Sequence, residues 1–322
     1  MNKTANASHS DRLLLFQKTG NILGIESAIA EKDFWICWLL KQLYSVSALS
    51  DSLLFRGGTS LSKVYNLINR FSEDVDITVD KKVFGFTDTH ETLRGTSRTK
   101  RRKLIIEMQS TCHAYIASAF LSLLNKQIAT ILQDDSTWSL IVNESNPEHI
   151  EFRYPRSGID ANEYVKPFVL LEIGVLAQIA PSEIRTIKPY AAEHFPEVFE
   201  SALCTITSIK PERTFWDKVT ILHAEHHRPA EKRFPIRHAR HYYDLAMLSK
   251  SPICNSALSD IALFEEVVTH KKLFFQSDWA RYDLATLKEI SLMPNALWLT
   301  NLENDYKAMF PMFIGDVPLF EE

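Results

Sequence analysis

Residues 53–79 have the sequence LLFRGGTSLSKVYNLINRFSEDVDITV, in which three features follow one another closely. An apolar run ends in two glycines, a short amphipathic segment follows, and two aspartates separated by one residue come near the end. This order of apolar runs and glycines predicts a strand over 53–56, a helix over 60–69 and a second strand over 74–79.

The two aspartates are expected on one face of the second strand. Because side chains alternate along a strand, Asp74 and Asp76 project to one side, and Val75, Ile77 and Val79 project to the other. Two carboxylates held this close repel each other, and a hard divalent cation that binds both removes the repulsion. The pair therefore predicts a Mg²⁺ site, and the alternative is an edge strand with two solvated aspartates.

The two glycines complete a possible phosphate site. Gly57 and Gly58 have no Cβ, so their backbone N–H groups can approach an anion at the start of the following helix. Thr59 and Ser60 add hydroxyl donors at the same place. The alternative is an ordinary surface turn, but the order strand, turn, helix, strand favours a functional site.

These residues resemble a known superfamily. GGTSLSKVY (57–65) followed by RFSEDVDI (70–77) is similar to the signature of the DNA polymerase β-like nucleotidyltransferases. More narrowly, it resembles the AbiEii group, the toxin components of AbiE-type toxin–antitoxin and phage-abortive-infection systems. EKDFWICWLL (31–40) is similar to the helix that precedes the signature in that group, and the resemblance covers most of residues 25–250.

The resemblance and the sequence pattern together imply an α+β fold. A polymerase β-like mixed sheet flanked by helices is expected in residues 1–203, and a mainly helical C-terminal domain that contributes to the active site in residues 204–322. Helical periodicity and apolar runs predict the remaining elements. Helices are expected at 11–23, 26–46 and 100–132, and strands at 139–144, 149–154 and 167–176.

The apolar run PFVLLEIGVL (167–176) contains one carboxylate, Glu172. Such a run is typical of a central strand that is covered on both faces, where an unpaired carboxylate is costly. The superfamily pattern implies a third acidic residue on a neighbouring strand, and Glu172 is the candidate third metal ligand and catalytic group. The alternative is a structural ion pair with an arginine such as Arg153.

Two C-terminal helices supply further candidates. In the resemblance, Lys218 matches a lysine that points into the active site, and Arg240 and Asp244 match two residues of an Arg-Asp-x-Tyr-Asp-Leu helix whose first aspartate is His241 here. Lysine suits a triphosphate, and aspartate can orient it. The alternative is a helix–helix salt bridge. The residues expected to bind nucleotide are Gly57, Gly58, Thr59, Ser60, Ser72, Lys218 and Arg240.

The resemblance implies transfer of a nucleoside monophosphate from a nucleoside triphosphate, with two Mg²⁺ ions held by Asp74, Asp76 and Glu172. The implied acceptor is the 3′ end of tRNA, and the implied partner is an antitoxin, often a DNA-binding repressor. Two alternatives stay open: an acceptor on a protein hydroxyl or a small molecule, and a non-catalytic nucleic-acid-binding regulator.

Composition limits these functions only modestly. The 322 residues are 45% hydrophobic with a net charge of -4, so any nucleic acid must be bound by local patches. Four widely spaced cysteines suggest neither zinc nor disulfides, and no apolar run is long enough for a membrane span, so a cytoplasmic protein is expected. Basic residues form a candidate RNA surface over 94–103 and an anion surface over 228–237, and the histidines at 223–227 leave a less favoured zinc site open.

Overall fold

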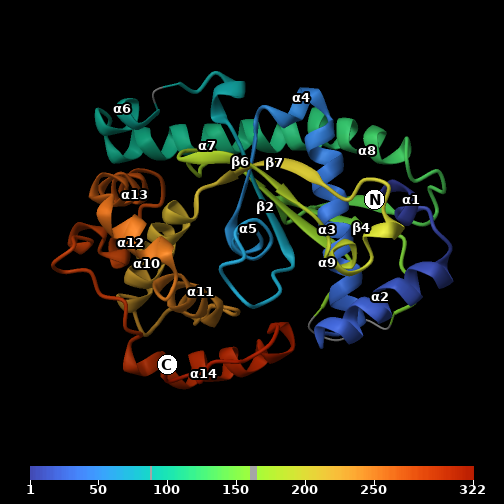
Figure 1. Cartoon of the computed structure of the whole chain (residues 1–322). Coiled ribbons are helices and arrows are strands. Elements are labelled where there is room, and N and C mark those ends of the chain that lie inside the picture. Colours follow the sequence, from blue (N-terminus) through green and yellow to red (C-terminus); the bar gives the residue numbers. More distant parts are fainter. Residues whose placement is uncertain (88, 160–164) are drawn as a thin grey trace.

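The structure, a computed structural model, describes residues 1–87, 89–159 and 165–322. Within these residues, one mixed sheet has the strand order β3-β4-β5-β2-β1-β7-β6 (Figure 1). The strands are β1 Leu53–Arg56, β2 Asp74–Val79, β3 Ser139–Asn143, β4 Asn146–Arg153, β5 Val169–Gly174, β6 Ser182–Ile187 and β7 Cys204–Ile209. The predicted α+β class with a mixed sheet is confirmed.

Strand pairing brings the conspicuous stretch to the centre of the sheet. β2 pairs antiparallel with β1 and parallel with β5, so β2 is a central strand and not an edge strand. The expectation that β5 is covered on both faces is wrong, because its residues alternate between buried and half-buried. The half-buried face is open because it contributes to a polar cavity.

The N-terminal helices cover the opposite face of the sheet. They are α1 Asn2–Ala5, α2 His9–Leu23, α3 Ser27–Ser45 and α4 Ser47–Ser50. The indole of Trp35 stacks on the ring of Tyr154, with the ring centroids 5.4 Å apart. The indole of Trp38 stacks on the ring of Phe152, with the centroids 5.7 Å apart. These aromatic residues belong to the larger hydrophobic core, as expected from their helical spacing.

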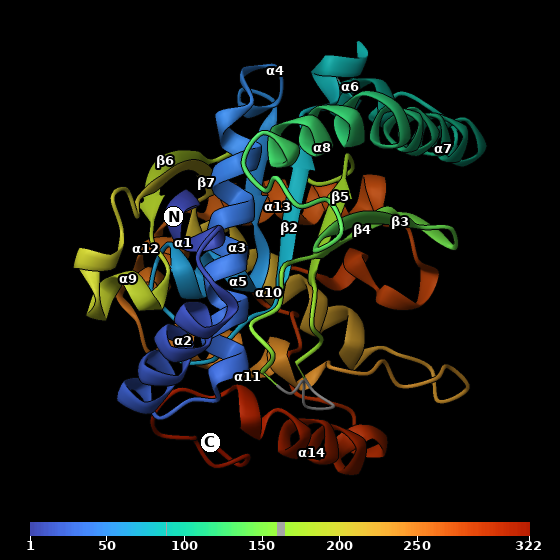
Figure 2. The same cartoon turned by 90° about the vertical axis from the view of Figure 1, so that its right-hand side faces the viewer.

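A long helical segment runs along the end of the sheet, as Figures 1 and 2 show. It consists of α7 Arg98–Tyr115, a π-helical turn Ile116–Phe120 and α8 Leu121–Ala129, and α6 Thr89–Arg94 precedes it. One helix over 100–132 was predicted, and the three consecutive segments match it within about one turn at each end.

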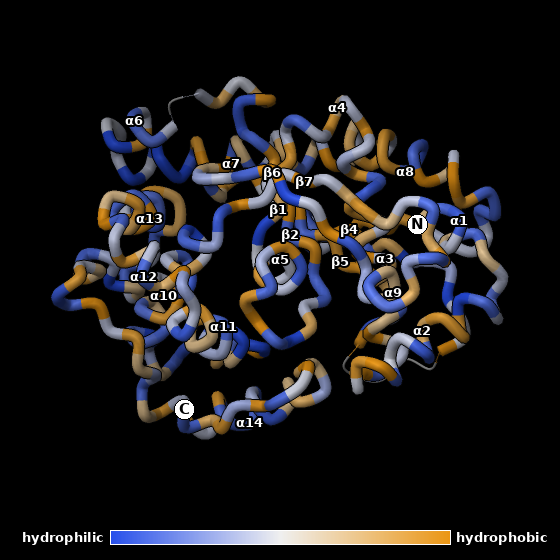
Figure 3. Tube along the Cα trace, viewed as in Figure 1, coloured by the Kyte–Doolittle hydropathy of each residue, from blue (hydrophilic) through white to orange (hydrophobic). Residues whose placement is uncertain are grey.

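The C-terminal helices form a second hydrophobic core with α5 Gly57–Lys63 and the residues after it. They are α10 Pro211–His226, α11 Ala239–Ser249, α12 Pro252–Ser259, α13 Ile261–Phe274 and α14 Leu299–Ala308, and the short α9 Tyr190–His194 lies before them. Because β7 belongs to the sheet, the helical part begins at Pro211 and not at residue 204. Figure 3 shows hydrophobic residues concentrated in the inner strands and helices.

Candidate active site

The two aspartates of β2 face a polar cavity. Asp74 and Asp76 line a cavity of about 110 Å³ that also reaches α10 and α11. Val75, Ile77 and Val79 are buried in the core on the other side of the strand. The alternation expected from the sequence is therefore present, and both carboxylates point away from the apolar core.

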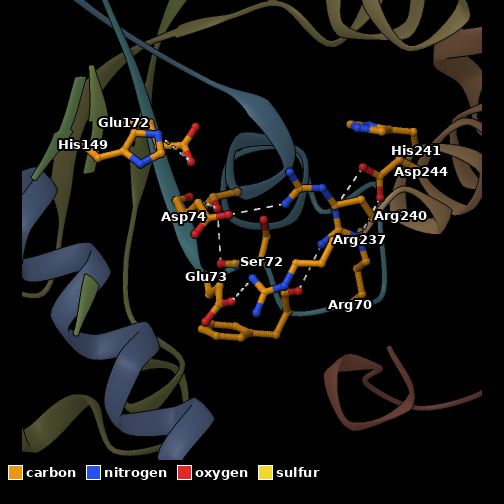
Figure 4. Close-up of polar contacts among 12 residues, drawn as sticks. Arg70, Ser72, Glu73, Asp74, His149, Glu172, Arg237, Arg240, His241 and Asp244 are labelled. Carbon is orange, nitrogen blue, oxygen red and sulfur yellow. Dashed lines mark hydrogen bonds and ion pairs between the residues drawn. The ribbon is translucent and has the colours of Figure 1, made fainter. Parts of the chain in front are cut away.

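The third carboxylate lies on the neighbouring strand. Glu172 of β5 is directly opposite Asp76 in the register, and His149 of β4 is directly opposite Glu172. His149 Nε2 lies 3.7 Å from Glu172 Oε1 (Figure 4). The alternative ion pair between Glu172 and Arg153 is not formed, because Arg153 pairs with Glu151 at 3.0 Å.

Burial and neighbouring carboxylates raise the pKa values of Asp76 and Glu172. Burial raises the pKa of Asp76, Arg56 opposes this shift, and Asp74 adds to it. Burial, with the charges of Asp76 and Asp74, raises the pKa of Glu172 to about 7. Carboxylic acids with this behaviour favour a bound cation or a retained proton.

The Gly-Gly pair lets α5 start directly against these carboxylates. Gly57 has a φ of +79°, and a Cβ there would lie 1.9 Å from Asp76 Oδ2. A Cβ at Gly58 would lie 2.8 Å from both Arg70 and Ser72. Both positions therefore need glycine for a close approach, and Gly57 also needs it for its backbone conformation.

The hydroxyls of Thr59 and Ser60 are buried and bound to backbone carbonyls. Thr59 donates to the carbonyls of Ser72 and Asp74, and Ser60 donates to the carbonyl of Gly57 at 2.8 Å. The Thr59 contacts attach α5 to the start of β2 and the Ser60 contact closes the first turn of α5, so neither hydroxyl lines the cavity. Ser72, in contrast, lines the cavity.

Lys218 and Asp244 come together in a buried ionic cluster. Lys218 Nζ donates to Asp244 Oδ2 at 2.6 Å, and Arg70 binds the same carboxylate through two nitrogens at 2.7 and 2.9 Å. Burial alone would raise the pKa of Asp244, but the charges of Arg70 and Lys218 lower it to about 2. The helix–helix salt bridge that the sequence left as an alternative is therefore formed, and Lys218 also lines the cavity wall.

His241 and Arg240 lie beside this cluster on α11. His241 Nδ1 lies 2.9 Å from Lys218 Nζ, and burial together with that lysine lowers the pKa of His241 well below its usual value. The imidazole is thus neutral and accepts a hydrogen bond where the family pattern has an aspartate. Arg240 Nη1 lies 3.3 Å from Asp74 Oδ2 and links α11 to β2.

Arg56 is a cavity residue that sequence reasoning missed. It ends β1 opposite Asp76, and no residue in the described part of the chain forms a hydrogen bond or ion pair with its side chain. Asp217 of α10 also lines the cavity and pairs with Lys271 at 3.2 Å. The only sequence signal for Arg56 is its position directly before the Gly-Gly pair. No pattern in the sequence indicated that Asp217 lines the same cavity as Asp76.

The EKD segment of α3 supports the site from behind. Its three charged residues are buried, and each contacts a different part of the chain. Lys32 pairs with Glu73 at 2.6 Å, next to the catalytic candidate Asp74, and Asp33 pairs with Lys63 at the end of α5 at 2.8 Å. These contacts explain why charged residues interrupt an otherwise apolar helix.

The other candidate surfaces lie outside the cavity lining. The basic run over 94–103 is largely exposed. His223 accepts a hydrogen bond from the Ser291 amide at 3.2 Å and contacts the Arg281 carbonyl at 2.9 Å, a structural role. Within residues 1–87, 89–159 and 165–322, no group of three or more His, Cys, Asp or Glu side chains could hold a metal ion by itself.

No helix in these same ranges is long and apolar enough to cross a membrane. No curated protein sequence matches the chain. Among solved structures, the nucleotidyltransferase toxin MenT4 of Mycobacterium tuberculosis H37Rv is similar, with 16% identity, a TM-score of 0.44, and coverage of 93% of this chain and 88% of that chain. The family model described as nucleotidyl transferase AbiEii toxin, type IV toxin–antitoxin system, matches residues 38–322. The chain therefore belongs to the AbiEii family of nucleotidyltransferase toxins.

Proposed function

We propose that this nucleotidyltransferase transfers a nucleoside monophosphate from a nucleoside triphosphate to the 3′ end of an RNA, with tRNA as the natural acceptor. The observation that carries the proposal is the open face of β2 and β5, where Asp74, Asp76 and Glu172 meet the cations of α10 and α11. Carboxylates opposite cations suit a metal-bound triphosphate.

The donor set fits Mg²⁺. In the described part of the chain, the Asp76 carboxylate has no hydrogen-bond or ion-pair partner. The Asp74 carboxylate pairs there only with Arg240. Mg²⁺ is commonly held by one or two carboxylates, water and substrate phosphates. Asp74 and Asp76 would therefore hold two Mg²⁺ ions together with the substrate. Glu172 would be a third protein ligand, on the side where the acceptor hydroxyl binds. Bound Mg²⁺ would offset the negative charge of the triphosphate.

The chain's own residues would hold the triphosphate. The backbone N–H groups of Gly57 and Gly58 start α5 and lack partners within that helix. Lys218 and Arg240 supply positive charge on the opposite wall, and Ser72 adds a hydroxyl. These groups would place the α-phosphorus between the acceptor and the pyrophosphate.

In the reaction, the acceptor hydroxyl oxygen bonds to the α-phosphorus, and the bond from that phosphorus to the β-phosphate oxygen breaks. Pyrophosphate leaves with the electron pair of the broken bond. Glu172 would orient the hydroxyl and accept its proton. His149 lies beside Glu172 on the acceptor side.

The biological setting follows from the family. A toxin of a toxin–antitoxin system implies an antitoxin partner. We propose that this antitoxin is a DNA-binding repressor, that the toxin acts in the cytoplasm, and that blocked tRNA charging contributes to abortive infection by phage. The exposed basic run over 94–103 favours RNA over a protein or small-molecule acceptor.

The test supplies the purified protein with Mg²⁺, total tRNA and each of the four α-³²P nucleoside triphosphates in turn. Label in tRNA is the expected result and names the nucleotide. Label in protein instead would replace RNA with a protein acceptor, and no label in RNA, protein or added small molecules would contradict the proposal.

A further inference from the structure

A second cavity, of about 830 Å³, lies where β4 ends and β5 begins. Three arginines and three aromatic residues contribute to its lining, and none of the described residues that line it is acidic. Positive charge beside aromatic rings is the chemistry that binds single-stranded nucleic acid.

The arginines of this cavity have different roles. Arg12 is buried and donates to the carbonyls of Ala5 and Ala7, so it builds the wall. Arg153 and Arg156 are exposed instead. The Arg153 guanidinium forms an ion pair with the nearby Glu151 carboxylate, with Nη2 and Oε2 3.0 Å apart. Both exposed guanidinium groups are accessible to the phosphates of a ligand.

The aromatic side of the cavity includes Phe168, which is half-buried. Lys32 and Lys166 lie 5.8 and 5.6 Å from the centre of its ring. Lys32 is held by Glu73, whereas Lys166 is exposed at the surface. A base that stacks on Phe168 would therefore meet a positive charge close by.

Two residues of the cavity lining, Arg153 and Phe168, lie close along the chain to residues of the carboxylate site. Alternation along β4 places Arg153 on the same side as His149, and Phe168 is the residue directly before β5. Phe168 is four positions before Glu172, a distance of about 13 Å along an extended chain. A nucleic-acid strand that lies in the cavity can thus direct its end toward Glu172.

We propose that this cavity binds the single-stranded end of the acceptor RNA. Its phosphates contact Arg153 and Arg156, and a base stacks on Phe168. This inference deepens the proposed function and rests on it, because it identifies where the acceptor lies relative to Asp74, Asp76 and Glu172.

The chain offers a matched control for the test. Arg185 on β6 pairs with Glu183 at 3.0 Å, two residues before it, just as Arg153 on β4 pairs with Glu151. Arg185 does not line the cavity. The experiment measures binding of a short fluorescein-labelled single-stranded RNA by anisotropy, without nucleotide or metal, over a range of salt concentrations. It compares the wild type, the double variant R153Q/R156Q and R185Q.

We expect at least tenfold weaker binding for R153Q/R156Q, with a salt dependence reduced by about 1.4 in its logarithmic slope, as for two lost phosphate contacts. R185Q should bind like the wild type, and all proteins should melt alike. Unchanged binding by R153Q/R156Q, or an equal loss in R185Q, would overturn the assignment.

Transfer assays then separate this inference from the proposed function. With labelled nucleotide and RNA, R153Q/R156Q should have a higher KM for RNA and an unchanged KM for nucleotide. A wild type that binds RNA through these arginines but labels no RNA would contradict the proposed function alone. A wild type that labels RNA with a KM insensitive to R153Q/R156Q would contradict the cavity assignment alone.

Discussion

At the residue scale, Glu172 keeps its proton to a higher pH than a free carboxylic acid. Burial and the neighbouring Asp76 and Asp74 raise its pKa from 4.5 to about 7. A carboxyl group whose pKa rises on folding destabilises the folded state as pH increases between those two values. The metal-free wild type should therefore lose stability relative to Glu172→Gln as pH rises from about 5 to about 8, which thermal melting can measure.

Mg²⁺ provides the control for that experiment. If Glu172 helps bind the ion, Mg²⁺ should raise the melting temperature of the wild type at the upper pH more than that of Glu172→Gln. Parallel pH profiles for the two metal-free proteins would show that the carboxyl group does not hold its proton as described.

Arg56 gives a second prediction at this scale. Arg70, Lys218 and Arg240 are already paired with carboxylates, whereas the guanidinium of Arg56 has no such partner in the described chain. Arg56 is therefore available to the triphosphate or pyrophosphate. We expect Arg56→Gln to raise the KM for nucleotide about tenfold, a loss of about 1.4 kcal/mol. Arg56→Lys should recover part of it, and an unchanged KM in the glutamine variant would refute the role.

The sequence predicted the residues whose chemistry is local. Asp74 and Asp76 are two residues apart, so strand alternation alone places them together. Asp244 was predicted only through the family resemblance, and its contact with Arg70 spans 174 positions of the chain. Such contacts depend on how the helical part packs on the sheet, which no local pattern encodes.

At the scale of elements, the start of α5 is constrained by β2. Gly57→Ala adds a Cβ at positive φ and places it against Asp76. Gly315→Ala is a matched control, because Gly315 has a φ of +80° with nothing near its Cβ position. We expect Gly315→Ala to cost about 1 kcal/mol of unfolding free energy with full transfer activity.

Gly57→Ala should cost more than its control and should also abolish most nucleotide transfer, because Asp76 must move. Denaturant unfolding and transfer assays of the two variants measure both effects. Equal stability and activity in the two variants would mean that the close approach of Gly57 and Asp76 is needed neither for stability nor for nucleotide transfer.

The contact between α3 and β2 supports the site through a buried ion pair. Lys32→Met leaves the Glu73 carboxylate buried, with Arg237 as its remaining ion-pair partner among the described residues. Loss of one partner of a buried pair costs about 3–5 kcal/mol. We expect Lys32→Met to lower the free energy of unfolding by the lower part of that range, as measured by denaturant unfolding.

The double variant Lys32→Met/Glu73→Gln is the control. Because it removes both charges, it should recover part of the lost stability. If the double variant is less stable than Lys32→Met by the full cost of a second independent substitution, the two side chains do not act as a pair.

Predictable and unpredictable elements differ for physical reasons. β1 and β2 were predicted with their exact residues, because glycine and alternation delimit them. α5 was expected over 60–69 but covers Gly57–Lys63, because the glycines themselves start the helix. β6 was not predicted, since its sequence SEIRTI is mostly exposed at the edge of the sheet and lacks an apolar pattern.

At the scale of the whole molecule, the candidate active site lies between two hydrophobic cores. The sheet supplies the carboxylates, and α10 and α11 supply Lys218 and Arg240. A buried ion pair from Arg70, shortly before β2, to Asp244 of α11 joins these parts, and a second pair from Lys32 to Glu73 joins α3 to the start of β2. The order of elements could be predicted in large part, but their joint cavity could be expected only through the family resemblance.

The most direct test of the central claim compares nucleotide transfer to RNA by the wild type, Asp76→Asn and the exposed control Asp135→Asn, with Mg²⁺ and with a chelator. We expect Asp76→Asn to lose at least about 1000-fold in rate, about 4 kcal/mol, and to melt no lower than the wild type because carboxylate repulsion is relieved. Asp135→Asn should retain full activity, and the chelator should stop the wild type. Transfer by Asp76→Asn at the wild-type rate, or transfer that persists in the chelator, would contradict the account.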